Sequence, residues 1–110
     1  MLKRLASDKL LPRGSLLTEI IETLTSRVGK IEHGFTDIQR AADEVVASST
    51  VEESIRLAKR LYDSEVHQAR MLATFILGRL AFKSDKSLGY LRMRVSKDQD
   101  WRVQEILAKA

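Results

Sequence analysis

Apolar side chains recur at spacings of three and four residues from about residue 15 to the end of the 110-residue chain. This period places them on one face of an α-helix, whereas a strand would show alternation at every second residue. No convincing alternation occurs, and the only proline, Pro12, precedes this region. The sequence therefore predicts an all-α fold, with an N-terminal extension over residues 1–14 and one helical domain over residues 15–110.

Breaks in the apolar pattern divide the domain into six predicted helices. They cover about residues 15–28, 35–46, 51–62, 65–81, 88–95 and 99–110. Thr50 and Glu53 have the spacing of a capping box, which marks the start of the third helix. We expect Asp63 or Ser64 to cap the fourth helix, and Asp98 to cap the sixth. The fourth helix is the most apolar, as expected for a helix that is buried on two sides.

The second half of the chain contains an internal repeat. Residues 63–73 fall onto residues 98–108 when displaced by 35 positions, with identity at three of the eleven positions. Each unit joins one helix to a second through a turn that contains an aspartate. A period in the mid-thirties built from helix pairs is typical of an α-solenoid. The sequence therefore predicts an α-solenoid of about three helix pairs, and an ordinary helical bundle is the alternative.

Residues 63–78 and 98–110 resemble HEAT repeats, in which a turn aspartate precedes a valine, a basic residue and a run of Ala and Leu. The ending, residues 96–110, is similar to the DNA alkylation repair family of HEAT-like repeat proteins. Some members of that family are glycosylases that remove positively charged alkylated purines. The likeness covers residues 50–110 well and residues 15–47 only in helical pattern. It implies a HEAT-like solenoid, a duplex DNA partner and a truncated, N-terminal portion of a longer protein.

The family signature is a tryptophan followed four residues later by an acid, both on the concave DNA-binding surface. Trp101 and Glu105 have that spacing, with Glu in place of the more usual Asp. The resemblance implies that both are catalytic: the indole would hold a cationic base, and the carboxylate would stabilise the positive charge that develops on the sugar. The alternative is a core tryptophan and a solvated glutamate. Because no second tryptophan completes the cleft, we expect weak or no catalysis from this chain alone.

Charge is unevenly distributed along the chain. The net charge is +4, but residues 1–54 carry seven basic and nine acidic side chains, whereas residues 55–110 carry twelve and six. Basic side chains near helix ends can contact phosphates, and the predicted nucleic-acid-binding residues are Arg92, Arg94, Lys97 and Arg102. A solvated rim is the alternative. Because aromatic residues make up only 5% of the chain, contact with a duplex backbone is favoured over single-strand stacking.

Other classes of site find no support in the sequence. There is no cysteine, the two histidines lack metal-ligand spacing, and we predict neither a metal nor a cofactor. No apolar run approaches the roughly 18 residues that a membrane span needs, so we expect no membrane partner and a cytoplasmic location. Two other readings stay open: a HEAT-like protein–protein scaffold without nucleic-acid binding, and self-association through the C-terminal helix with Ile106 and Leu107 between chains.

Overall fold

The computed structural model describes residues 14–31 and 34–109, and every regular element in these two stretches is a helix. The elements are α2 (Gly14–Gly29), α3 (Thr36–Ser48), α4 (Val51–Tyr62), α5 (His67–Leu80), α6 (Asp85–Met93), the 3₁₀ turn η1 (Val95–Lys97) and α7 (Trp101–Lys109). The predicted all-α class is confirmed. The predicted N-terminal extension lies outside the described residues, apart from Gly14 at the start of α2.

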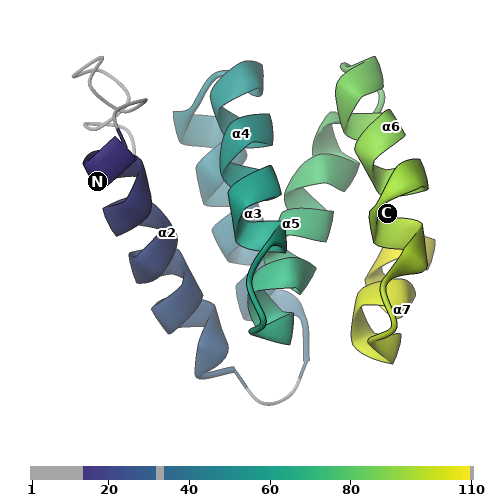
Figure 1. Cartoon of the computed structure of the whole chain (residues 1–110), viewed down its shortest axis with the longest axis horizontal. Coiled ribbons are helices and arrows are strands. Elements are labelled where there is room, and N and C mark those ends of the chain that lie inside the picture. The colour runs from purple at the N-terminus through teal and green to yellow at the C-terminus, as the bar shows by residue number, and fades with distance from the viewer. Residues whose placement is uncertain (1–13, 32–33, 110) are drawn as a thin grey trace.

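The six α-helices form three consecutive pairs, α2 with α3, α4 with α5 and α6 with α7 (Figure 1). The first helices of the pairs make one row, and the second helices make another row behind it (Figure 1). Helix α5 is central, because it packs against α2, α3, α4, α6 and α7. The predicted HEAT-like stack of about three pairs is therefore confirmed.

The core is built around α5. This helix buries residues on all sides, including Leu72, Ile76 and Leu77, because neighbours from both rows surround it. The ring of Phe75 meets that of Phe35 edge to face, with 6.3 Å between centroids. Such edge contacts suit the aromatic quadrupole and add to the gain from burial. The prediction that the fourth helix is buried on two sides is correct.

The structural repeat has a period of 34 residues. Helices α4 and α6 begin 34 residues apart, and so do α5 and α7. At this offset the buried Leu72 corresponds to the buried Ile106, whereas the predicted offset of 35 aligns it with the half-buried Leu107. The predicted offset of 35 is therefore one residue out of register, because it aligns two aspartates, Asp63 and Asp98, that occupy different places in their turns.

The same offset relates the hydrogen bonds of the two turns that precede α5 and α7. In each turn a side-chain oxygen, from Ser64 or Asp98, accepts a hydrogen bond from the backbone N–H two residues later, at 3.0 and 2.8 Å. The side chains of Arg70 and Gln104 donate to the carbonyl oxygens of these same two residues, at 2.9 and 2.8 Å. The two turns therefore have the same local pattern of hydrogen bonds.

The helix caps agree with the sequence in one case and differ in two. The Thr50–Glu53 capping box is formed, with bonds of 3.1 and 2.9 Å. Neither predicted residue caps α5, whose N-cap Val66 makes no side-chain cap. The prediction that Asp98 caps α7 is also wrong, because Asp100 accepts the hydrogen bond from the N–H two residues later, at 2.9 Å. The side chain of Asp98 is instead bonded within the turn.

Candidate nucleic-acid interface

Trp101 and Glu105 lie on one solvent-facing side of α7. Trp101 opens the helix and is 65% exposed, and Glu105 is exposed one turn later. Val103 and Ile106, on the opposite side, are fully buried against the stack. The predicted shared face is therefore present, and the alternative of Trp101 as a core residue is wrong.

Arg102 lies against the Trp101 ring. Its guanidinium carbon is 5.0 Å from the ring centroid, a cation–π arrangement. The same guanidinium is 3.4 Å from the Asp100 carboxylate. Arg102, predicted to bind phosphate, is therefore already engaged with a carboxylate and a ring. The Trp101 indole in turn presents a face that accommodates a planar cation.

Arg94 is held between the second and third pairs. Its guanidinium donates to the Tyr90 hydroxyl at 3.1 Å and to Asp63 at 3.4 Å. The guanidinium carbon also lies 5.3 Å from the centroid of the Tyr62 ring and 5.8 Å from that of Tyr90. Arg94 therefore stabilises the contact between α4 and α6, and only part of its hydrogen-bonding capacity faces solvent.

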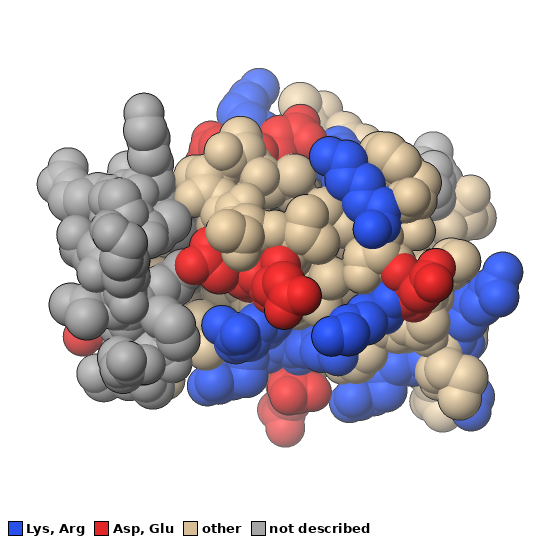
Figure 2. Space-filling view, turned by 90° about the horizontal axis from the view of Figure 1, so that it is seen from above, with Lys and Arg blue, Asp and Glu red and all other residues tan. Residues whose placement is uncertain are grey.

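Arg92 and Lys97 differ from the other two predicted phosphate ligands. Both are exposed, and within the described stretches neither forms an ion pair. Figure 2 shows Lys and Arg side chains gathering along one edge of the surface seen from above. Of the four predicted nucleic-acid-binding residues, these two keep their positive charge free for an anion.

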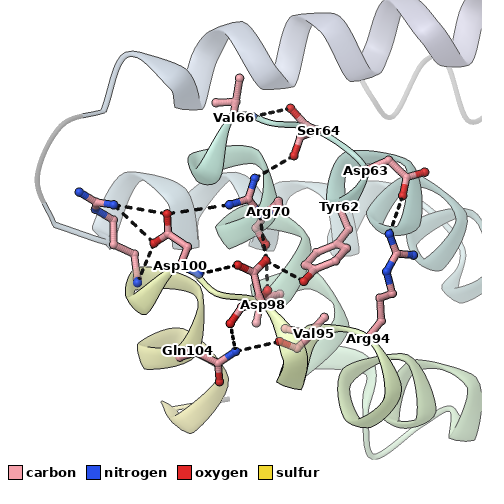
Figure 3. A network of polar contacts seen from close by, with 12 residues as sticks. Tyr62, Asp63, Ser64, Val66, Arg70, Arg94, Val95, Asp98, Asp100 and Gln104 are labelled. Atoms are coloured by element: carbon pink, nitrogen blue, oxygen red, sulfur yellow. Dashed lines mark hydrogen bonds and ion pairs between the residues drawn. The ribbon is translucent and has the colours of Figure 1, made fainter.

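A buried carboxylate organises the turn before α7 (Figure 3). The side chain of Asp98 is 6% exposed, and its Oδ2 accepts hydrogen bonds from the Tyr62 hydroxyl at 2.7 Å and from Arg70 Nε at 2.9 Å. Its Oδ1 accepts the N–H of Asp100 at 2.8 Å. The network ties α4 and α5 to the start of the helix that carries Trp101.

Protonation in this network follows from burial and hydrogen bonding. Burial alone would raise the pKa of Asp98, but donors from Tyr62, the Asp100 N–H and Arg70 outweigh it, and the pKa lies below its ordinary value. Burial, followed by the bond to Asp98, raises the pKa of the Tyr62 phenol well above its ordinary value. At neutral pH a charged carboxylate therefore accepts from a neutral hydroxyl.

Local spacing in the sequence carries no signal for this network. Tyr62 and Arg70 precede Asp98 by 36 and 28 residues, respectively, so no local spacing links them. The 34-residue repeat was a usable signal, since it equates the turns that contain Ser64 and Asp98.

The apolar end of α7 is partly covered by the chain itself. Ile106 is fully buried, so its predicted place between two chains is wrong. Leu107 is half-buried against the core. Ala110 lies outside the described residues.

The chain is similar to a solved structure, that of AlkD2 from Streptococcus mutans, with a TM-score of 0.80 and 39% sequence identity. The chain is therefore similar to a member of the AlkD family of DNA alkylation repair proteins. The match covers 84% of this chain and 44% of AlkD2, so the chain spans less than half the length of that relative. No protein-family model matches the sequence, and no curated protein matches it.

This relationship confirms the family resemblance predicted from the sequence, together with the HEAT-like fold. Within the AlkD-like stack, the Trp101–Glu105 pair stands at the start of a second-row helix, α7. In the described part of the chain, no helix is long and apolar enough to cross a membrane.

Proposed function

We propose that this chain is an AlkD-like module that binds duplex DNA at the end of the stack formed by α7 and its preceding turn. The observation that carries the proposal is the exposed Trp101 with Glu105 one turn away, on a chain similar to a member of the AlkD family. A large exposed aromatic ring with a carboxylate on the same helical face suits an interface better than a solvated surface.

Phosphate contacts would come from the cations beside this face. Lys97 and Arg92 are exposed and free of ion pairs among the described residues, so each can neutralise a phosphate. Arg94 and Arg102 keep their charge but share it with carboxylates, so we expect smaller contributions from them. Binding through backbone phosphates is independent of base sequence and weakens as salt rises.

The finer proposal concerns alkylated bases. In a complete AlkD-like protein, the Trp101 ring would hold a cationic alkylated purine by cation–π attraction, and Glu105 would stabilise the developing sugar cation. Here Arg102 already lies over the ring, so a base approaching that face must displace it. For this chain alone we expect little or no release of N3- or N7-alkylated purine, because the sequence holds a single tryptophan. A cytoplasmic location also remains a prediction.

The single tryptophan supplies a direct test. Titration with duplex DNA should change the intrinsic fluorescence of Trp101 in a saturable way. Lys97→Glu should raise the duplex concentration at half-saturation about tenfold, as expected for a lost phosphate contact. The control Lys30→Glu makes the same charge change at an exposed residue after α2 and should raise this concentration much less. Unchanged Trp101 fluorescence at duplex concentrations that bind the protein would contradict this site.

A further inference from the structure

The described arginines divide into two groups by their ion pairs. Every arginine of α2, α3 and α5 in these stretches lies near a carboxylate: Arg27, Arg40, Arg70 and Arg79. Helices α4 and α6 differ, because Arg56, Arg60 and Arg92 form no ion pair among the described residues. Unpaired arginines therefore concentrate on the first-row helices of the second and third pairs.

Three of the free cations share one face of α4. Arg56, Lys59 and Arg60 are all exposed and are spaced three and four residues apart. Like charges at this spacing repel each other and weaken a helix. Glu52 stands four residues before Arg56, a spacing that stabilises a helix, and the helix dipole compensates Lys59 and Arg60 in the last turn. Local helix stability therefore accounts for part of the cluster, but no ion pair among the described residues neutralises any of the three cations.

Lys59 of α4 and Arg94 after α6 meet at the Tyr90 ring. Lys59 Nζ lies 5.3 Å from the centroid of the Tyr90 ring on α6, and the Arg94 guanidinium lies 5.8 Å from the same centroid. The Tyr90 ring also meets the Tyr62 ring edge to face at 5.8 Å. We name the exposed cations of α4 the outer basic face: Arg56, Lys59 and Arg60. Asp63, the carboxylate beside it, is engaged by Arg94.

We propose that the outer basic face binds the phosphate backbone of duplex DNA as a second contact surface, separate from Trp101 and Lys97. Arg56 and Arg60 lie four residues apart on α4, which is a rise of about 6 Å along the helix axis. Cations at this spacing can neutralise neighbouring phosphates of a nucleic-acid backbone, and each neutralised phosphate releases counterions and adds to the affinity. The choice of duplex DNA as the polyanion rests on the proposed function, whereas the surface itself does not.

The test measures binding of a fluorescently labelled duplex by anisotropy over a range of salt concentrations. The variant Arg56→Glu/Arg60→Glu should bind at least tenfold more weakly. In the milder Arg56→Gln/Arg60→Gln variant, the slope of log K against log salt should fall in magnitude by about two, as expected for two lost phosphate contacts. Circular dichroism verifies that each variant keeps its helix content.

The matched control is Lys30→Glu/Lys83→Glu, which makes the same change in net charge at exposed residues outside the outer basic face. It should bind the duplex less than about threefold more weakly than the parent chain. Equal losses in the two double variants would overturn the proposal, because net charge alone would then explain them. Unchanged duplex binding in Arg56→Glu/Arg60→Glu would also overturn the proposal. The same holds if this variant loses binding only to vesicles of phosphatidylserine and phosphatidylcholine and not to the duplex.

Trp101 fluorescence, followed in the same titrations, separates this proposal from the Trp101 site. Suppose that Trp101 fluorescence changes on binding and that Arg56→Glu/Arg60→Glu has the same half-saturating duplex concentration as the parent chain. This result overturns the outer basic face and supports the Trp101 site. Duplex binding that depends on Arg56 and Arg60 without any change in Trp101 fluorescence supports the outer basic face and contradicts the Trp101 site.

Discussion

The carboxylate of Asp98 receives donors from three parts of the chain: the hydroxyl of Tyr62, the guanidinium of Arg70 and the N–H of Asp100. It joins the end of α4, the first turns of α5 and the start of α7. Because Asp98 is nearly inaccessible to water, its charge depends on these donors. Its removal also leaves the Arg70 cation, which is itself mostly buried, without its nearest carboxylate.

We expect Asp98→Asn to lower the free energy of unfolding by about 2–3 kcal/mol, since hydrogen bonds to a charged group each contribute about 1.5–3 kcal/mol. Asn retains the shape of the side chain, so the loss reports charge and hydrogen bonding rather than packing. The matched control is Asp37→Asn, which removes an exposed ion pair with Arg40 and should cost less than about 1 kcal/mol. Urea unfolding at pH 7 measures both; equal losses would show that the network adds nothing.

The pH dependence of the Asp98 contribution follows from its lowered pKa. As the pH falls below the ordinary aspartate value, about 3.9, the unfolded chain binds a proton while the folded chain still resists it. The stability that Asp98 supplies is therefore fully present above about pH 5 and is lost as the pH falls through the folded pKa. The difference in unfolding free energy between the parent chain and Asp98→Asn should shrink below pH 4. A difference that stays constant down to pH 3 would contradict the lowered pKa.

At the residue scale, the sequence predicted which residues lie on the same face of a helix better than it predicted which side chains are in contact. The four-residue spacing of Trp101 and Glu105 was enough to place them together, and the buried Val103 and Ile106 explain why that face points outward. The stacking of Arg102 on Trp101 could not be predicted, because it depends on a side-chain rotamer and on the position of Asp100. Long-range partners leave no local pattern to detect.

At the scale of elements, α7 depends on its first turn. The Asp100 side chain accepts the N–H of Arg102 and also pairs with that guanidinium, which covers the Trp101 ring. The sequence predicted helix existence and approximate extent well, because apolar spacing records which face is buried. It predicted the caps less well, because several acceptors in a row, such as Asp98 and Asp100, compete for the same N–H groups.

The variant pair Asp100→Ala and Asp100→Asn separates the cap from the ion pair. Loss of the cap in Asp100→Ala should cost about 1 kcal/mol and should increase quenching of Trp101 fluorescence by acrylamide, because the first turn frays. Asp100→Asn keeps a capping oxygen, so it should retain most of the stability while releasing Arg102. If both variants lose the same stability, then Asp100 acts through its charge and not as a cap.

At the scale of the whole molecule, three helix pairs stack around α5. Arginines of α2, α3 and α5 lie near carboxylates, whereas Arg56 and Arg60 of α4 form no ion pair among the described residues. The repeat in the sequence was sufficient to predict this stack, because each helix pair needs a neighbour to bury its apolar faces. The distribution of charge along the chain predicted a basic second half. It did not predict the cluster of free cations on α4, because ion pairing in the folded chain decides which charges remain available.

The salt dependence of duplex DNA affinity tests the central claim most directly, that this AlkD-like stack binds the DNA backbone. We expect saturable binding of a short duplex at about 50 mM salt, with log K falling linearly against log salt by about 0.9 for each phosphate neutralised. A slope of several units should persist whatever the base sequence of the duplex. Absence of saturable binding at about 50 mM salt, or an affinity that does not change up to about 200 mM, would contradict the claim and favour a protein–protein scaffold.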